Sequence, residues 1–291
     1  MYKTLTPAGR NLAELMAAVF LLGLVPLFAK LVPMDAVSII FYRCVFGAAG
    51  LLAFVLWRRH GLGLGTGRDY LRTLVVGALL AAHLSSYFHA IQLTTVAIAI
   101  AATFTFPVMT VLIEPLLDGA RVRLLDLGLA VVAFGGVALI AAPAGSDSAV
   151  LSGVLWGLFS ALMFALRNVL HRRWLSHHPS SQAMGYQLLV VVLCLLAFTE
   201  PPASVNPPAW LGLALLGLVF TALAHSLFAG SMRHLPAKTA ALMASLQPVI
   251  SILAAAVVLA EVPGPRTLVG AAMVVSVAVM EGVAVPRRAR A

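Results

Sequence analysis

A polar segment within an apolar stretch holds the side chains best suited to bind a small molecule. His83, Ser85, Ser86, Tyr87 and His89 lie within seven residues of one another. His83 and Tyr87 are four residues apart and share one face of a helix, where an imidazole and a phenol can hydrogen-bond a carboxylate or an amine. The alternative is that these groups bond to neighbouring helices and only fix packing. We expect His83 and Tyr87 to line a cavity.

A second candidate is an aromatic stripe at helical spacing. Trp156, Ser160 and Phe164 follow one another at four-residue steps and so form one side of a helix. Such a stripe favours an apolar slot for a bulky group, with one hydroxyl to orient it, although ordinary helix packing gives the same pattern. Arg167 follows one turn later, and we expect its long stem to carry the charge toward the water at the cytoplasmic interface; binding the carboxylate of a substrate is the alternative.

Two further residues, Tyr42 and Arg43, join the candidate binding set. A guanidinium stays protonated, so Arg43 must face water, a helix C-terminus or an anionic group. An anchoring role and binding the carboxylate of a small molecule remain as alternatives. Glu14 and Glu114 fall at the ends of apolar stretches, where we expect structural or capping roles.

The amino-acid composition indicates which type of secondary structure must position these residues. Of 291 residues, 62% are apolar and 10% are charged, whereas a globular domain is about 45–50% apolar and about 25% charged. The chain therefore lacks the polar residues to coat a water-facing surface. Long unbroken apolar runs favour helices over the alternating strands of a membrane barrel. Cys44 and Cys194 lie in apolar runs, so we expect no disulfide.

The apolar runs predict an all-α membrane protein with ten transmembrane helices. These spans fall at about residues 11–32, 36–57, 71–92, 95–117, 124–142, 150–171, 181–199, 209–231, 238–260 and 266–284. Each is close to the roughly 20 residues that a membrane crossing needs. No small-residue cleavage site follows the first run, so we expect a retained span and not a signal peptide.

The basic residues test this assignment, because cytoplasmic loops carry an excess of Lys and Arg. With the N-terminus inside, fifteen basic residues fall on the cytoplasmic side, and only Lys30 and Arg266 fall opposite. The fifteen are Lys3, Arg10, Arg58, Arg59, Arg68, Arg72, Arg121, Arg123, Arg172, Arg173, Arg233, Lys238, Arg287, Arg288 and Arg290. Both termini are therefore predicted to be cytoplasmic. The excess of basic residues in the predicted cytoplasmic loops accounts for the net charge of +9, and we expect no nucleic-acid partner.

The sequence contains an internal repeat that relates residues 1–145 to residues 146–291. Pro107 aligns with Pro248 and His83 with His225, and Tyr42 aligns with Tyr186, at offsets of 141 to 144 residues. Five spans in each copy is an odd number, so the second copy enters the membrane from the opposite face. Inverted repeats build sites near the membrane midplane at interrupted helices. We therefore expect His225 to line the same cavity as His83.

The two aligned prolines predict interruptions in the fourth and ninth spans. Each proline removes a backbone donor and leaves the carbonyl four residues earlier, that of Thr103 or Ala244, without its helical partner. Membrane helices also tolerate proline without a functional reason. We expect Pro107 and Pro248 to act as hinges.

This pattern resembles the EamA branch of the drug/metabolite transporter superfamily. The resemblance rests on two five-helix halves, a Pro-Val pair in each fourth span, and the segment AAVVLAE followed by LVGAAMVVSVAVM. It covers residues 11 to 284 and implies transport of metabolites, with aromatic amino-acid exporters of the YddG type as an analogy. The second copy keeps an acidic residue, Glu261, where the first copy has Ala120, so no shared role for that carboxylate is implied.

We therefore expect an inner-membrane exporter of bacteria that carries small molecules, most of all apolar or aromatic amino acids. Alternating access would proceed through a central cavity between spans 1 to 4 and 6 to 9. Export of nucleobases or cationic drugs, a channel and an intramembrane enzyme are the alternatives, but no H-E-x-x-H, G-x-S-x-G or phosphate-binding G-x-x-x-x-G-K motif is present. We expect a monomer in membrane lipid, without a cofactor, metal or catalytic residue.

Overall fold

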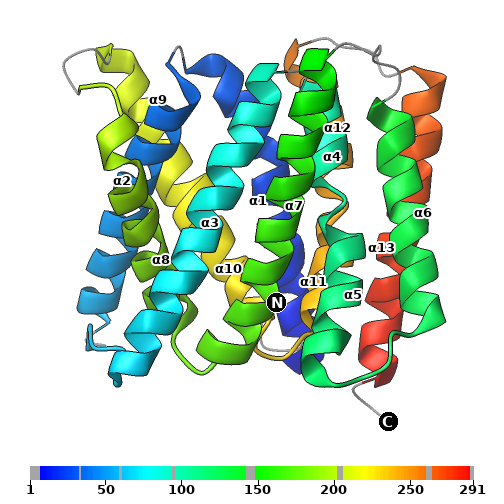
Figure 1. Cartoon of the computed structure of the whole chain (residues 1–291), viewed down its shortest axis with the longest axis horizontal. Helices are drawn as coiled ribbons and strands as arrows, with labels where there is room; N and C mark the ends of the chain where they lie inside the picture. The colour runs from blue at the N-terminus through cyan, green and yellow to red at the C-terminus, as the bar shows by residue number, and fades with distance from the viewer. Residues whose placement is uncertain are drawn as a thin grey trace.

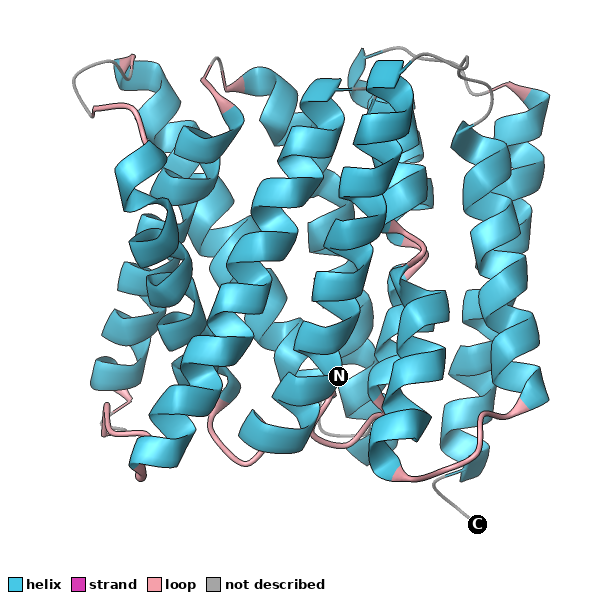
Figure 2. Cartoon of the chain, in the orientation of Figure 1, coloured by secondary structure: helices cyan, strands magenta, loops and turns pink. Residues whose placement is uncertain are grey.

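The computed structural model describes residues 7–32, 34–58, 61–93, 96–141, 148–201, 206–259 and 264–288. These ranges are helical and contain no strand, and the helices run side by side along one direction (Figures 1 and 2). The α-helices are α1 (Pro7–Leu31), α2 (Ala36–Trp57), α3 (Gly67–Leu93), α4 (Val96–Thr103), α5 (Phe106–Asp118), α6 (Leu124–Ala141), α7 (Ser148–Leu175), α8 (Ser180–Leu195), α9 (Pro207–Gly217), α10 (Ala224–Ser231), α11 (Ala237–Ala244), α12 (Gln247–Leu259) and α13 (Pro265–Arg288). A 3-10 turn (η2, Leu196–Phe198) follows α8 and a π-helical turn (η4, Leu218–Leu223) joins α9 to α10.

Each predicted span is occupied by one of these helices or by a consecutive pair. Six stretches are long and apolar enough to cross a membrane among the described residues: 37–57, 67–91, 151–175, 180–198, 207–231 and 237–258. Two shorter apolar helices, Leu124–Gly136 and Leu268–Val277, fall in the fifth and tenth predicted spans. The prediction of a helical, multi-pass membrane protein is confirmed, whereas the count of ten crossings stays a prediction. Glu261 lies outside the described residues.

The fourth and ninth spans are interrupted where the prolines predict it. The first pair breaks between Thr103, the last residue of α4, and Phe106, the first of α5. In the second pair α11 ends at Ala244 and α12 begins at Gln247. Pro107 and Pro248 each occupy the second position of the new helix, where a missing N–H costs little because the first helical turn has no acceptor for it. Each proline thus starts a second helix after the break.

The eighth span has a different irregularity. The π-helical turn η4 shifts the register between α9 and α10, and the Thr221 hydroxyl donates to the Leu216 carbonyl at 2.7 Å. The third span, its repeat counterpart, is one continuous helix. Single π-turns inside helices are frequent at functional sites, and this one lies directly before His225.

The packing of the helices exchanges elements between the two halves. The first helix of the first half, α1, packs against α10 and α12 of the second half, and α7, the first helix of the second half, packs against α3, α4 and α5. The remaining helices pair with their own counterparts, α2 with α8 and α6 with α13. Figure 1 shows α6 and α13 together at one edge of the bundle. Such a reciprocal arrangement arises when two copies of a duplicated unit exchange their first helices.

Two glycines allow close helix contact beside the residues of interest. A Cβ at Gly217 would lie 2.5 Å from the Arg43 carbonyl oxygen and 2.6 Å from the Cβ of Phe46. A Cβ at Gly157 would lie 2.5 Å from the Cβ of Ala102. Small residues at such crossings let helix backbones approach in lipid, so these glycines place α2 against α9 and α7 against α4.

Candidate functional site

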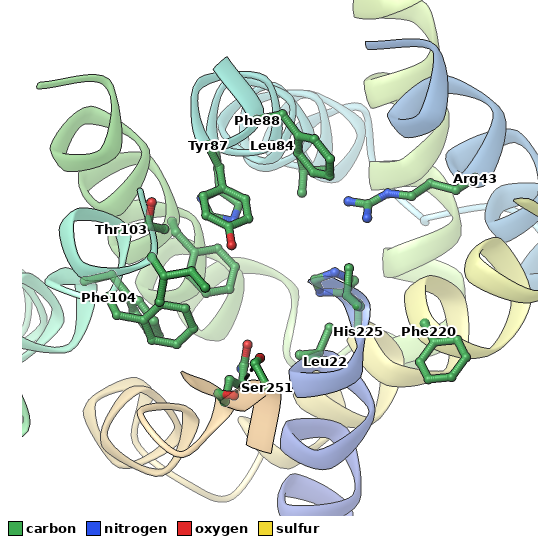
Figure 3. A pocket seen from close by; sticks show the side chains of 16 residues that line it. Leu22, Arg43, Leu84, Tyr87, Phe88, Thr103, Phe104, Phe220, His225 and Ser251 are labelled. Carbon is green, nitrogen blue, oxygen red and sulfur yellow. Dashed lines mark hydrogen bonds between the residues drawn. The ribbon is translucent and has the colours of Figure 1, made fainter. Parts of the chain in front are cut away.

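A cavity of about 80 Å³ lies in the middle of the bundle and receives residues from both halves. Figure 3 shows it from close by. Its lining comes from eight helices and the π-turn: Leu22, Val25, Arg43, His83, Leu84, Tyr87, Phe88, Ile100, Thr103, Phe104, Phe106, Phe164, Phe220, His225, Gln247 and Ser251. The two interrupted spans border it, through Thr103 to Phe106 on one side and Gln247 to Ser251 on the other. Interrupted helices in a membrane protein are tolerated where they line such a space.

His83 lines this cavity and is held by a helix of the other half. Its Nδ1 lies 2.8 Å from the Ser160 hydroxyl and 3.1 Å from the Ser160 carbonyl oxygen. The Ser160 hydroxyl also lies 3.0 Å from the His83 carbonyl oxygen, to which it can donate. The rings of His83 and Phe164 stack with centroids 4.3 Å apart. These contacts fix the orientation of the imidazole and tie α3 to α7.

Tyr87 lies on the same face of α3, as the four-residue spacing predicts. Its ring is nearly parallel to that of His83, with 6.3 Å between centroids. The hydroxyl points into the cavity from one side, while Arg43 and His225 approach from another (Figure 3). The structure therefore brings a phenol, an imidazole and a guanidinium around one space.

Arg43 and His225 reach the cavity with polar atoms unsatisfied. Arg43 is 3% exposed, and its guanidinium carbon lies 5.4 Å from the centroid of the Phe88 ring. The Nε of Arg43, the Nδ1 of His225 and the hydroxyl of Thr103 are buried without a hydrogen-bond partner in the structure. Buried polar groups without a partner are rare, so their convergence on one cavity distinguishes it from an ordinary packing defect.

Aromatic rings form the apolar wall. Phe164 contacts Phe106 edge-to-face at 4.9 Å between centroids and stacks on Phe228 at 6.2 Å. Phe88, Phe104 and Phe220 complete the lining. The walls are thus flat and rigid, and they suit the ring or branched chain of a small molecule.

The structure separates the other candidate residues from the cavity. Ser160 is fully buried and bonds to His83 instead of facing the space. Trp156 is 41% exposed and packs edge-on against His89 and Phe159. The Tyr42 hydroxyl donates to the Glu200 carbonyl at 2.7 Å, and its ring packs on Trp210. Of the predicted stripe, only Phe164 lines the cavity, because the helix turns Trp156 outward.

Arg167 requires a correction, because it does not extend toward water. Its side chain is fully buried and donates from Nε and Nη2 to the Gln187 side-chain oxygen, at 3.1 and 2.7 Å, and from Nη1 to Asn168 at 3.0 Å. Gln187 in turn bonds to His171 at 3.0 Å. These neutral polar partners on α7 and α8 hold the charge inside the bundle, and nothing in the linear spacing indicated them.

Several lining residues were not singled out from the sequence. Thr103, Gln247 and Ser251 line the cavity beside the two breaks, and the Ser251 hydroxyl lies 2.6 Å from the Gly23 carbonyl oxygen. The signal that could have found them is their position within four residues of Pro107 or Pro248. Phe104 and Phe106 also lie close to Pro107, but apolar residues fill every span and so do not stand out, and Phe220 lies near neither proline.

Beyond the cavity, a set of ionic contacts joins the two halves at the end of the bundle where α5 and α7 terminate. The Glu114 carboxylate accepts hydrogen bonds from the backbone N–H groups of Ala237 and Lys238 at 2.7 and 2.8 Å, and from Arg172 at 3.0 Å. Lys238 also pairs with Asp126. Each contact joins one half of the chain to the other, and Glu114 caps the N-terminus of α11, as expected for a capping role. We call Glu114, Asp126, Arg172 and Lys238 the ionic cluster.

Comparison with known proteins places the chain among transporters. The profile described as the EamA-like transporter family matches residues 12–142 and 151–280. One uncharacterized transporter of Archaeoglobus fulgidus is 26% identical over 264 residues, 91% of this chain and 93% of that protein. A second from the same organism is 25% identical over 223 residues, 76% of this chain and 78% of that protein. A solved crystal structure has the same fold, with a TM-score of 0.82 at 20% identity over 95% of this chain and 98% of that chain.

Proposed function

This chain belongs to the EamA-like transporter family, and from that premise we propose that it exports small metabolites, most of all apolar or aromatic amino acids, by alternating access. A transporter needs a binding space that both halves share and that can open to either side in turn. The observation that carries the proposal is the central cavity, which takes His83 and Tyr87 from the first half and Phe164 and His225 from the second.

The reciprocal packing supports the proposed mechanism. In our proposal residues 1–145 and 146–291 are inverted copies that exchange conformations around the cavity. The breaks before Pro107 and Pro248 let the two parts of each interrupted span tilt separately, because no continuous ladder of hydrogen bonds joins them. The helices α6 and α13, which pack on each other away from the cavity, act as a brace.

We propose the ionic cluster as a gate at this end of the bundle. In our proposal this end faces the cytoplasm, as the basic-residue distribution favours, with both termini on that side and the chain in the inner membrane of a bacterium. Opening the gate separates Glu114 from α11 and from Arg172, which lie on the opposite half. At the other end the residue aligned with Glu114 is Ala255, which has no charge to form the equivalent contact. The repeat therefore does not duplicate this carboxylate at the aligned position.

The lining supports the proposed substrates. Five phenylalanines supply the walls, and a handful of polar groups face the interior, the combination that binds a small molecule with an apolar body and a polar head. Since no Asp or Glu lines the cavity among the described residues, a carboxylate proton relay is not part of the proposal. The coupling mechanism that we propose is flux down the substrate gradient, and the second candidate is proton exchange through the histidines.

Uptake and counterflow in proteoliposomes test the proposal. The purified chain is reconstituted and given radiolabelled amino acids, nucleobases and cationic drugs, with and without a proton gradient. We expect saturable flux of apolar and aromatic amino acids. Phe164→Ala should lower it, whereas Trp156→Ala, which removes an aromatic ring outside the cavity, should retain it. Absence of saturable flux for every compound overturns transport; flux of nucleobases alone overturns only the substrate.

A further inference from the structure

The central cavity presents a positive charge without a counter-charge. Every ion pair among the described residues lies elsewhere: Arg72 and His178 with Asp69, Arg172 and Arg173 with Asp118, Arg172 with Glu114, and Lys238 with Asp126. The guanidinium carbon of Arg43 lies 5.4 Å from the centroid of the Phe88 ring, and this partner is neutral. A guanidinium remains charged at any physiological pH, so its charge stays in the cavity.

A second buried cation lies in the same bundle. Arg167 is fully buried, and its hydrogen-bond partners Gln187, Asn168 and Met184 are all uncharged. No acidic residue lines the cavity among the described residues. A charge kept away from water is costly unless an opposite charge meets it, so an anion bound in the cavity would stabilise the charge of Arg43.

We propose that the substrate carries a carboxylate that pairs with Arg43, and that the cavity rejects molecules whose only charge is positive. The unsatisfied Nδ1 of His225 and hydroxyl of Thr103 then serve a second polar group on the same molecule, next to its carboxylate. The phenylalanine walls hold its apolar body. This inference rests on the proposed transport function and assigns the charge of the substrate, which the fold leaves open.

The site explains why the polar groups are distributed over both halves. Arg43 and Thr103 belong to the first half and His225 to the second. A carboxylate bound between them joins the halves and neutralises a buried charge in the same event. Arginine is suited to this task because its planar fork donates two parallel hydrogen bonds to a carboxylate.

A series of compounds with one phenyl body and different charges tests the inference on the full chain in proteoliposomes. The compounds are 3-phenylpropanoate (anion), phenylalanine (zwitterion), 2-phenylethanol (neutral) and phenethylamine (cation). We expect the two carboxylates to compete with the transported molecule and phenethylamine not to compete. This comparison needs no variant, so it does not depend on whether a variant folds.

Variants of Arg43 provide the second arm. Arg43→Gln should lower the flux of both carboxylates at least about tenfold, the factor expected for losing a charge-assisted hydrogen bond, while Arg43→Lys should retain part of it. Arg72→Gln, which removes a cation outside the cavity, is the control and should transport normally. Carriage of phenethylamine, or full flux of carboxylates in folded Arg43→Gln, overturns the inference while transport itself stands. No flux of any compound overturns the proposed function as well.

Discussion

The Glu114 carboxylate and the Lys238 backbone N–H lie 2.8 Å apart, although they are 124 residues apart in the chain. The same carboxylate accepts from Ala237 and Arg172, so three donors of the second half meet one acceptor of the first. Because Glu114 is 4% exposed, these bonds are shielded from water and from salt. Their loss is therefore expected to change the balance between the two access states.

Glu114→Gln is expected to open the cytoplasmic side more often. A charge-assisted hydrogen bond contributes about 1.5–3 kcal/mol, so access should rise about tenfold or more. The measurement is the labelling rate of Ser245→Cys, at a fully buried position beyond the ionic cluster, by an impermeant thiol reagent in a background without Cys44 and Cys194. Glu14→Gln, which removes a carboxylate outside the ionic cluster, is the control. Equal labelling rates in all three proteins would exclude Glu114 as a gate.

Ser160→Ala is expected to destabilise the protein without changing substrate affinity. The variant removes the hydroxyl 2.8 Å from the His83 Nδ1, while the Ser160 carbonyl oxygen at 3.1 Å remains as a partner. The expected loss is therefore that of one hydrogen bond, about 0.5–1.5 kcal/mol. Ser160 does not line the cavity and its carbonyl still holds the imidazole, so KM for the transported substrate should not change. Ser231→Ala, which removes one local hydrogen bond to Phe228, should lower the Tm less. A large rise in KM with unchanged Tm would place Ser160 in the binding site instead.

Tyr42 and Tyr87 are expected to respond differently to loss of the hydroxyl. Tyr87→Phe removes a hydroxyl that points into the cavity and should lower the flux about tenfold or less, the scale of one neutral hydrogen bond. Tyr42→Phe removes the bond to the Glu200 carbonyl and should lower the Tm with transport retained. The measurements are substrate flux and Tm on both variants. Normal flux in Tyr87→Phe together with reduced flux in Tyr42→Phe would contradict the assignment of Tyr87 to the cavity.

Gly217→Ala is expected to destabilise the contact that positions Arg43. The added Cβ would lie 2.5 Å from the Arg43 carbonyl oxygen, so α2 and α9 must separate. Overpacking of this kind costs about 1–3 kcal/mol, and a displaced Arg43 should also raise KM for a carboxylate substrate. Gly212→Ala is the matched control, because its Cβ would meet only Val32 at an ordinary 3.4 Å. A Tm of Gly217→Ala equal to that of the control would show that the helices adjust freely.

Stability is expected to fall below neutral pH through His178, in the loop between α7 and α8. Partial burial lowers the pKa of this histidine, His177 lowers it further, and Asp69 at 3.8 Å only partly opposes them. A histidine whose pKa is lower in the folded state stabilises the fold above its unfolded value of 6.5, and that stabilisation is lost as pH falls toward the folded value. His178→Gln should therefore reduce the drop in Tm between pH 7 and pH 5, and His177→Gln should reduce it less. An identical drop in wild type and His178→Gln would contradict this origin.

The features that depend on local pattern could be predicted from the sequence. Apolar runs of about 20 residues locate the helices because lipid requires each span to satisfy its own backbone hydrogen bonds. Pro107 and Pro248 located both interruptions, since a proline cannot donate within a helix. The spacing of His83 and Tyr87 placed them on one face, and the repeat placed His225 at the same cavity.

The features that depend on which helices are neighbours were decided by the tertiary structure alone. The three residues of the predicted stripe have different surroundings, because α7 contacts different elements at each turn. Trp156 is exposed, Ser160 hydrogen-bonds to His83, and Phe164 lines the cavity. Arg167 stays buried because Gln187 lies on the adjacent α8, and Glu114 accepts hydrogen bonds from α11 because that helix begins beside it. Periodicity states which residues share a helix face but not what that face meets. The chain's own residues therefore determined the spans and their breaks, while long-range packing determined which few polar groups reach the cavity and which bond to one another.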